Sequence, residues 1–201
     1  MKIILASSNE HKKKEIGDLF SGHQILLPKD LGIDFDCIED GQSFIDNALI
    51  KAKALKKTLK TVNLSHYAVL ADDSGLIVDA LPGLLGIKTA RFGSKDGVTL
   101  LEAHQKNRLL LDKLEGVEEA KRTARYVCAL ALIQDDWTIY CAQEIAEGRI
   151  LESEIGQQGF GFDPVFYCIE AKSPMALLSK ENKNKYSHRG KAARSILKLI
   201  G

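Results

Sequence analysis

The stretch Ala71-Asp72-Asp73-Ser74-Gly75-Leu76 decides how the rest of the chain is interpreted. An apolar run over 67–71 leads into it, and a second apolar run over 76–78 follows it. Such runs are typical of buried strands, where an unpaired charge is costly. If both carboxylates are ionised there, they need a cation or several hydrogen bonds. The alternative is a solvated turn, because Asp, Ser and Gly are common turn residues.

Length and composition fit one large domain, or one domain with two lobes. The chain has 201 residues, and 45% of them are hydrophobic, which is enough for a sizeable core. A net charge of +1 gives no general attraction to nucleic acid or to acidic membranes. Charge is locally uneven, because eight Lys or Arg residues oppose one acid over 172–201. This basic tail could bind an anion.

Cysteine usage and hydropathy indicate a reduced, soluble, cytoplasmic protein. The four cysteines form no close pair, which argues against a zinc knuckle or a CxxC redox site; they are Cys37, Cys128, Cys141 and Cys168. Cys128 and Cys141 lie in apolar segments and are interpreted as core residues. Residues 1–6 run directly into polar sequence, so we expect no signal peptide. No apolar run approaches the ~18 residues of a membrane span.

The N-terminal segment has the pattern of an anion-binding strand, loop and helix. A short strand over 2–6 is followed by Ser7-Ser8-Asn9 and a helix expected over 10–20, with Asn9 as its N-cap. Helix N-termini offer N–H groups to anions, and Lys12 starts on the inward side of this helix. The loop lacks the glycine-rich pattern of a P-loop. The alternative is an ordinary turn with solvated lysines.

A second helix is expected after the polar turn 38–43, with Ser43 and Asp46 as a capping box. One apolar stripe on it contains positions 44, 48, 52, 55 and 59. Four lysines are predicted to point away from the stripe into water, namely Lys53, Lys56, Lys57 and Lys60. Lys51 falls at the edge of the stripe, where a lysine either snorkels to water or reaches an anion.

The middle of the chain is interpreted as scaffold. We expect a surface loop over 82–92, a helix over 99–114, and a hairpin of strands over 123–133 and 138–150. Gly148 is expected to end or bulge the second of these strands. Strand-like and helix-like segments alternate before the hairpin, which predicts an α/β fold with a mixed sheet.

Two C-terminal segments are unusual. In the segment 159–164 the glycines permit positive φ, the phenylalanines offer flat faces to a nucleobase, and Asp163 before Pro164 is expected to be extended. A basic loop is expected over 180–185. The last helix is expected after Ser187, which places a histidine and an arginine in its first turn, where a cation needs a partner because it opposes the helix dipole. An aromatic-anchored core loop and a solvated turn are the alternatives.

Together these segments describe a site for a nucleoside triphosphate. Carboxylates beside lysines suit a Mg²⁺-phosphate site, because Mg²⁺ takes one or two carboxylates together with substrate phosphates. The residues concerned are Lys12, Glu39, Lys51, Asp72 and Asp73. The aromatic loop and the turn at 187–190 suit a base.

Five segments, in register over nearly the whole chain, resemble the inosine triphosphate pyrophosphatase family, whose members hydrolyse noncanonical purine nucleoside triphosphates. They lie at 7–12, 39–52, 71–76, 159–164 and 187–190. The resemblance implies a two-lobed α/β fold, with a long mixed β-sheet flanked by helices and a central nucleotide-binding groove. It also implies a single pyrophosphatase domain over 1–201, Mg²⁺ as the cofactor and a homodimer.

The resemblance further implies a role for each matching residue. The triphosphate would be cradled by Ser7, Ser8, Asn9, Glu10, His11 and Lys12. Glu39 and Asp73 would hold Mg²⁺, with Asp72 close by. Asp73 would orient or deprotonate the water and Lys51 would neutralise phosphate charge, so the implied catalytic residues are Asp73, Lys51 and Asp72. Ser74 would contact the substrate, and the base would be bound by Phe160, Gly161, Phe162, Asp163, Lys183, His188 and Arg189.

The sequence departs from the family pattern at two places. Ser7-Ser8-Asn9 stands where Thr-Gly-Asn is usual, and the loop over 82–86 differs from the commoner glycine-rich form. The implied activity is hydrolysis of ITP, dITP and XTP to the monophosphate and pyrophosphate. One alternative is a related pyrophosphatase acting on modified pyrimidine or m7-type nucleotides. The other is a non-enzymatic nucleotide- or RNA-binding module using the basic tail, although the near-neutral charge argues against nucleic acid as a partner.

Overall fold

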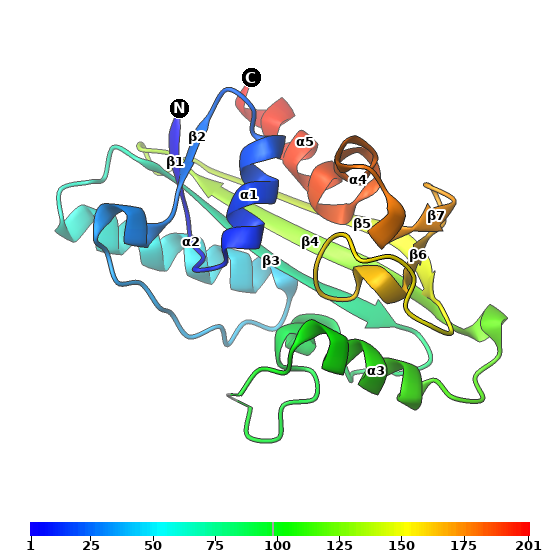
Figure 1. Ribbon diagram of the computed structural model, residues 1–201. Helices are drawn as coiled ribbons and strands as arrows, with labels where there is room; N and C mark the ends of the chain where they lie inside the picture. The colour runs from blue at the N-terminus through cyan, green and yellow to red at the C-terminus, as the bar shows by residue number, and fades with distance from the viewer. Residues whose placement is uncertain (98) are drawn as a thin grey trace. The chain divides into compact units, whose positions relative to one another are not determined.

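The computed structural model describes residues 1–97 and 99–201, and these contain a seven-stranded mixed sheet flanked by helices (Figure 1). The strand order is β2 (Gln24–Leu26), β1 (Lys2–Leu5), β3 (Ala68–Val78), β4 (Thr123–Ile133), β5 (Ile139–Ile150), β6 (Phe166–Cys168) and β7 (Ser173–Pro174). β1 pairs in parallel with β2 and β3, whereas β6 pairs antiparallel with β5 and β7. The predicted α/β fold with a mixed sheet is therefore confirmed.

The helices agree with the predicted ones except in the last quarter of the chain. The α-helices of the described residues are α1 (Glu10–Leu19), α2 (Phe44–Thr61), α3 (Ala103–Lys113), α4 (Lys180–Tyr186) and α5 (His188–Ile200). α3 begins four residues later than the predicted 99. The predicted basic loop over 180–185 is wrong, because Ser179 caps a helix there by accepting a hydrogen bond from the Asn182 N–H at 3.2 Å.

Short 3-10 helices connect these elements. They are η1 (Pro28–Leu31), η2 (Gly86–Arg91), η3 (Glu119–Lys121), η4 (Asp163–Val165) and η5 (Met175–Leu177). η2 lies within the loop predicted over 82–92, and η4 begins at Asp163, so the prediction that this residue is extended is wrong. In the described part of the chain, no helix has both the length and the hydropathy that spanning a bilayer requires.

The chain divides into two compact units. Unit 1 consists of Met1–Asp73, Cys128–Glu144 and Arg189–Gly201, and unit 2 consists of Ser74–Val127 and Ile145–His188. The strands β3, β4 and β5 contribute residues to both units.

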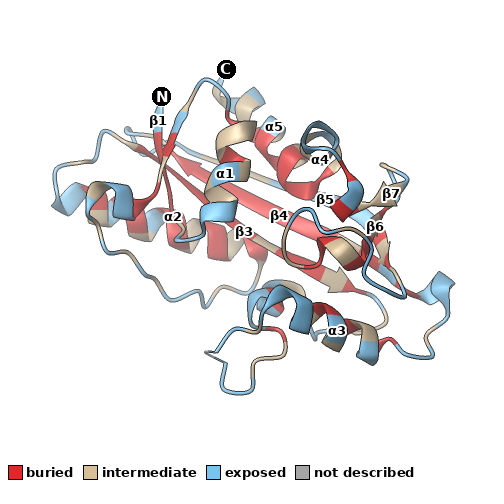
Figure 2. Cartoon of the chain, viewed as in Figure 1, coloured by how far each residue is buried: buried red, intermediate tan, exposed pale blue. Residues whose placement is uncertain are grey.

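In unit 1, the helices cover both faces of the strands. Successive residues of a strand point to opposite faces, so one set of alternate positions on β1, β3 and β4 packs against α1 and α5. This core includes Leu5, Leu70, Cys128, Ile16 and Ile196. Figure 1 shows α2 on the opposite face, and its predicted stripe of Phe44, Ala48, Ala52, Leu55 and Leu59 is buried. Figure 2 shows the buried residues along the strands and along the helix faces turned to them.

Lys56 on α2 contradicts the prediction that it points into water. Its side chain is fully buried, and its Nζ donates hydrogen bonds to the carbonyl oxygens of Ser65 and Tyr67, both at 2.8 Å. Burial lowers the pKa of the Lys56 ammonium group. The lysine thus ties the end of α2 to the segment that enters β3. Lys53, Lys57 and Lys60 are exposed as predicted.

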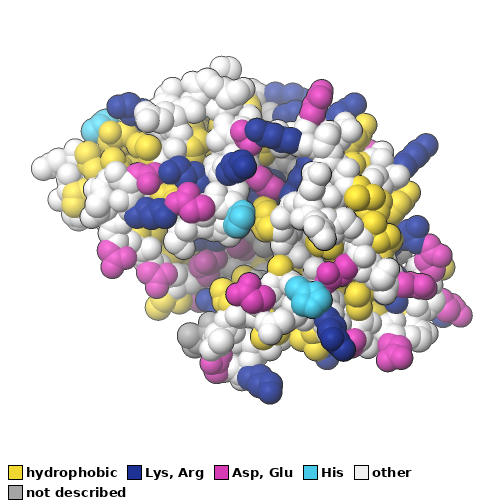
Figure 3. All heavy atoms as spheres, viewed as in Figure 1, with side chains coloured by type: hydrophobic (Ala, Val, Ile, Leu, Met, Phe, Trp, Pro, Cys, Tyr) yellow, Lys and Arg dark blue, Asp and Glu magenta, His cyan; other side chains and the backbone are white. Residues whose placement is uncertain are grey.

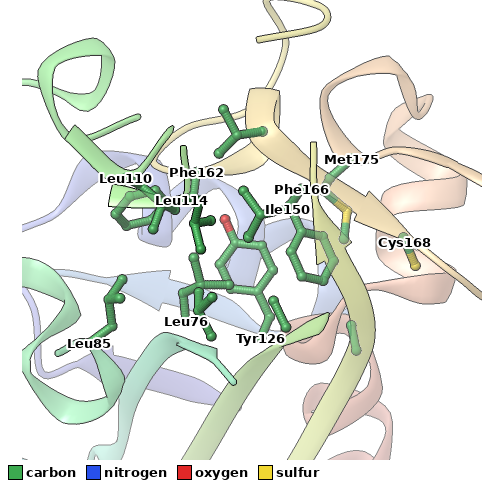
Figure 4. Close-up of a cluster of buried hydrophobic side chains, with 14 of the residues drawn as sticks. Leu76, Leu85, Leu110, Leu114, Tyr126, Ile150, Phe162, Phe166, Cys168 and Met175 are labelled. Carbon is green, nitrogen blue, oxygen red and sulfur yellow. The ribbon is translucent and has the colours of Figure 1, made fainter. Parts of the chain in front are cut away.

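Unit 2 has a hydrophobic core of its own, in which Tyr126 and Phe166 lie side by side (Figure 4). Gly148 lies inside β5 and pairs with Cys168 of β6, so the prediction that it ends the strand is wrong. A Cβ atom at this position would lie 2.3 Å from the Phe166 ring and from the Tyr167 carbonyl oxygen. Only glycine therefore lets β6 approach β5 this closely.

Arg122 is a buried charged residue inside unit 2. It is 4% exposed, and its guanidinium donates hydrogen bonds to three backbone carbonyl oxygens: Ile150 at 2.9 Å, Leu114 at 2.9 Å and Leu151 at 2.6 Å. These acceptors belong to the end of β5, the residue that follows it and the residue that ends α3. One planar side chain thus satisfies carbonyl groups that burial would otherwise leave without a partner.

We predict that Arg122→Met lowers the free energy of unfolding by about 3 kcal/mol, because it leaves buried carbonyl groups without donors. Arg122→Lys should lower the free energy of unfolding less, since an ammonium group can still donate to some of these carbonyl oxygens. Urea denaturation measures both changes. Lys121→Met is the matched control, because Lys121 is exposed, and it should change stability by less than about 0.5 kcal/mol. Equal losses at positions 121 and 122 would contradict the assignment.

Candidate active site

β3 carries Asp72 and Asp73 as neighbours, so their side chains point to opposite faces of the sheet. Asp72 shares the face of Leu70, towards α1 and α5, and Asp73 points towards α2. The two residues are 2% and 9% exposed. The interpretation of this stretch as part of a buried strand is therefore confirmed, and the solvated turn is wrong.

Asp72 is held by three donors from three other elements. Lys12 of α1 forms an ion pair with its Oδ1. Its Oδ2 accepts hydrogen bonds from Arg189 Nε at 3.0 Å and from Cys128 Sγ at 3.2 Å. Burial alone would raise the pKa of Asp72, but Arg189 and Lys12 outweigh this effect and hold the pKa well below its ordinary value. Asp72 is therefore an ionised, fully engaged carboxylate.

Arg189 begins the unit 1 part of α5 and bridges two carboxylates. Besides Asp72, it reaches Glu15 of α1, with its Nη1 donating to Oε2 at 2.6 Å. The partner that the arginine needs in a first helical turn is thus supplied by the protein itself. The arginine was predicted to bind the base, but it lies among the residues around Asp72. Glu15 was not predicted, although its position one turn after Lys12 on α1 was a usable signal.

On the other face, Asp73, Lys51 and Glu39 come together. Lys51 Nζ lies 2.6 Å from Glu39 Oε2 and 3.2 Å from Asp73 Oδ1. Burial raises the pKa of Asp73, although Lys51 and Lys12 act against it. Burial lowers the pKa of Lys51, but Asp73 and Glu39 outweigh it, so the net shift is upward. The ammonium group is therefore charged between two carboxylates.

Asn47 completes this group and was not among the predicted site residues. Its Nδ2 donates to Asp73 Oδ2 at 3.3 Å, and its Oδ1 accepts from the Gly41 N–H at 2.9 Å. A Cβ atom on Gly41 would lie 2.6 Å from this Oδ1, so the contact depends on glycine. The signal in the sequence was the position of Asn47 one helical turn before Lys51, on the same face of α2.

The charges of the two groups differ. Around Asp72, two carboxylates face two cations, because Glu15 and Asp72 meet Lys12 and Arg189. Around Asp73, two carboxylates share one lysine. The second group therefore carries one uncompensated negative charge, which favours the binding of a cation.

The donor set of the Asp73 group fits Mg²⁺. Glu39 and Asp73 contact the same ammonium group, so both carboxylates can approach one ion. Across the described residues, no group of three or more His, Cys, Asp or Glu side chains is placed to hold a metal. Two carboxylates with the remaining positions left to phosphate and water is the coordination that Mg²⁺ adopts with nucleotides.

The predicted phosphate loop lies at the start of α1. Asn9 is the N-cap, as predicted, and its Oδ1 accepts from the N–H groups of His11 at 2.9 Å and Lys12 at 3.2 Å. Its own N–H donates to Ser7 Oγ at 3.1 Å. The loop is exposed from Ser8 to His11. Because Lys12 also reaches Asp72, the loop and the acidic strand belong to one arrangement within unit 1.

In unit 2, Asp163 gathers several of the residues that were predicted to bind the base. Its Oδ2 accepts from the Phe160 N–H at 2.9 Å and from Lys183 Nζ at 2.8 Å. Lys183 Nζ also lies 5.0 Å from the centre of the Phe160 ring. Gly159 has φ +85°, and a Cβ atom there would lie 2.0 Å from Asp163 Oδ2. The glycine is therefore required for this turn.

The two phenylalanines of the loop have different environments. The ring of Phe162 is 3% exposed and packs against Phe92, with 6.0 Å between ring centres, so its side chain belongs to the core. Phe160 is partly exposed. Of the flat faces that were predicted for a base, the structure thus leaves that of Phe160 accessible. Gly161, with φ +65°, and Ser74 are also partly exposed.

β4 carries two residues that the sequence interpretation treated only as scaffold. Tyr126 stacks on His188, with 4.5 Å between ring centres and 6° between ring planes, and its hydroxyl donates to Asp163 Oδ1 at 3.4 Å. Cys128 contacts Asp72. They lie two residues apart and so point to the same face of β4. The spacing shows only that the two side chains share a face, and neither residue type by itself indicates a site.

Comparisons with known proteins identify the family of this chain. The Ham1 family profile matches residues 3–199. The chain is 44% identical over 200 residues to the dITP/XTP pyrophosphatase of Treponema denticola, covering 100% of this chain and 98% of that protein. It is 38% identical over 197 residues to the dITP/XTP pyrophosphatase of Clostridium perfringens, covering 97% and 95%.

The solved structures lead to the same family. The structure of the Staphylococcus aureus Ham1 protein superposes with a TM-score of 0.80 at 32% identity, covering 100% of this chain and 97% of that one. A HAM1 protein from Coxiella burnetii gives a TM-score of 0.82 at 28% identity, covering 100% and 98%. The profile match and the full-length relatives together show that the chain belongs to the Ham1 family.

Proposed function

We propose that this chain is a nucleoside triphosphate pyrophosphatase that hydrolyses dITP, ITP and XTP to the monophosphate and pyrophosphate. The observation that carries the proposal is the buried Lys51 between Glu39 and Asp73, a group with one excess negative charge. The relatives at 44% and 38% identity are dITP/XTP pyrophosphatases, which supports the same activity.

For the chemical step, Glu39 and Asp73 would hold Mg²⁺, which when bound supplies positive charge to the phosphates. Asp73 accepts a proton from the attacking water, whose oxygen forms the new bond to the α-phosphorus while the bond to the bridging oxygen of pyrophosphate breaks. Burial raises the pKa of Asp73 above its ordinary value, which is the direction that makes a carboxylate a better base. Lys51 neutralises charge on the phosphates, and the loop Ser7–Lys12 positions them, with Lys12 held in place by Asp72.

We assign Asp72 a positioning role in place of the implied catalytic one. Both of its oxygens already accept from protein donors, namely Lys12, Arg189 and Cys128. Because Arg189 and Lys12 hold the pKa of Asp72 well below its ordinary value, whereas burial raises the pKa of Asp73, Asp72 is the weaker base of the two. Asp72 instead fixes the lysine beside the phosphate loop. Its contribution to catalysis is the orientation of that lysine.

Selectivity for a 6-oxo purine would come from donors on Lys183 and His188, with the ring of Phe160 against the base and Ser74 and Asp163 beside it. A 6-amino group would place donor against donor, which is costly in a closed pocket. Arg189 contributes less to this selectivity than the resemblance implies, because its Nε and Nη1 donate to carboxylates.

We further propose that both units act as one functional domain over 1–201, in a cytoplasmic homodimer without a nucleic acid partner. Two cations of the basic tail, Lys183 and Arg189, are paired with buried carboxylates, which weakens the tail as an RNA-binding surface. Figure 3 shows basic and acidic side chains intermixed on the visible face.

A product assay tests the reaction. The substrates are XTP, dITP, dATP and dGTP, each with Mg²⁺, and we expect pyrophosphate from XTP and dITP. For dATP and dGTP we expect kcat/KM to be at least about tenfold lower, because the 6-amino group of dATP opposes the donors and the 2-amino group of dGTP lacks an acceptor. Orthophosphate as the product would contradict the reaction type. Turnover of m7-GTP or modified pyrimidine triphosphates above that of XTP would favour the alternative pyrophosphatase.

A second prediction concerns the group on α2. Lys51→Met and Asp73→Asn should each lower kcat by about 100-fold or more, because one removes phosphate neutralisation and the other the base. The matched control is Lys53→Met, two residues away and exposed, which should leave kcat within about twofold. Steady-state kinetics and melting curves are compared for all three. A large loss of melting temperature with kcat retained would make the role of the group structural.

A third prediction concerns acid stability. The folded-state pKa of Asp72 lies below the unfolded value of about 3.9, so its stabilising effect is full above that pH and disappears as the pH falls towards the folded-state pKa. Asp72→Asn should therefore lower the unfolding free energy at pH 7, and its difference from wild type should narrow below about pH 4. Asp34→Asn, at an exposed position, is the control. A difference that stays constant from pH 7 to pH 3 would contradict the assignment.

A further inference from the structure

We infer that Tyr126 is a positioning residue that determines base specificity, because it holds the ring of His188 in a fixed plane. The inference rests on the proposed function, in which His188 donates to the 6-oxo group of the base. Neither the resemblance nor the spacing along β4 assigned Tyr126 any part in the site.

The contact between the two rings is close to an ideal stack. The ring centres of Tyr126 and His188 lie 4.5 Å apart and the planes differ by 6°. Both residues are nearly buried, at 7% and 6% exposure. Tyr126 is itself held by Phe166, whose ring centre lies 4.6 Å away at an angle of 52° (Figure 4). The imidazole therefore rests on a phenol ring that is fixed by the core.

Tyr126 is also linked, through Asp163, to Lys183, the second candidate donor to the base. Its hydroxyl donates to Asp163 Oδ1 at 3.4 Å, while the other oxygen of Asp163 accepts from Lys183 Nζ at 2.8 Å. The hydroxyl contact is the weaker of the two interactions, since 3.4 Å is long for a hydrogen bond between oxygens. We therefore assign the effect to the ring of Tyr126 and only a minor part to its hydroxyl.

The plane of an imidazole decides where its N–H points, because both nitrogens lie in the ring plane. Rotation about the bond to the ring would turn the donor away from a carbonyl oxygen on the base. It would also let the opposite side of the ring meet a 6-amino group. A flat partner with 6° between the planes restricts this rotation. Loss of the partner should thus weaken discrimination between bases more than it weakens the chemical step.

The experiment compares Tyr126→Phe, which keeps the ring, with Tyr126→Met, which keeps volume without a flat face. The readout is the ratio of kcat/KM for XTP to that for dATP, with kcat and KM resolved. We expect Tyr126→Met to lower the ratio about fivefold or more, mainly through a higher KM for XTP, and Tyr126→Phe to keep it within about twofold. The matched control is Phe92→Met, a buried aromatic residue of the same core that packs on Phe162; it should keep the ratio.

Three kinetic results would overturn the inference. They are an unchanged ratio in Tyr126→Met, an equal loss in Phe92→Met, and a loss in Tyr126→Phe as large as in Tyr126→Met. Since Tyr126→Met could fail to fold, the NMR signals of the His188 ring protons are recorded for wild type and Tyr126→Phe. Stacking should shift them upfield in both proteins, and ordinary shifts in wild type would overturn the inference. This readout needs no turnover. If wild type itself does not prefer XTP over dATP, the proposed function fails while the ring stack is still tested.

Discussion

The buried carboxylate of Asp72 is the constraint on which the arrangement of unit 1 depends. A carboxylate at 2% exposure is tolerable only if its charge is balanced and its oxygens are hydrogen-bonded. Lys12 and Arg189 meet this requirement from the first turns of two different helices. The start of α1 and the start of α5 are thereby fixed against the same point of β3. Glu15 adds a direct link between the two helices through the same guanidinium.

The two faces of β3 use neighbouring carboxylates in different ways. The group around Asp72 is electrically balanced and closed, so it acts as a fixed support. The group around Asp73 has two carboxylates and one lysine, and burial raises the pKa of its central acid. A balanced group needs nothing further, whereas an acidic excess beside a lysine suits a site that receives a metal and a polyanion. In our proposal the group around Asp73 therefore carries out the chemistry, and the group around Asp72 positions the elements of the site.

Local patterns predicted what depends on residues close in the chain. The caps at Asn9 and Ser43, the stripe of α2 and the position of Lys51 at its edge all follow from helical spacing, and the structure has them. The wrong predictions concern partners that lie elsewhere. Lys56 has the spacing of a solvated residue, yet its acceptors, Ser65 and Tyr67, belong to the segment that follows the helix.

The same reasoning explains which site residues were found. Glu39, Lys51 and Asp73 form one group as expected, because an acid in an apolar stretch such as Asp73 needs a cation and Lys51 lies at the edge of the buried stripe of α2. Arg189 was correctly seen to need a partner, but its spacing could not show that Asp72 and Glu15 supply it. The sequence predicts only a scaffold role for Tyr126, since an aromatic residue on a buried strand usually packs in the core. Its role beside His188 depends on a pairing between β4 and α5 that no sequence period encodes.

The alternation of β3 also limits how this stretch can change during evolution. Asp72 serves α1 and α5 and Asp73 serves α2 only because one residue separates them along the strand. Replacement of a neighbouring side chain leaves that assignment intact. A single insertion or deletion within β3 before Asp72 would exchange the two faces, so that Asp72 would point towards α2 and Asp73 towards α1 and α5. The strand should therefore accept new side chains far more readily than any change in its length.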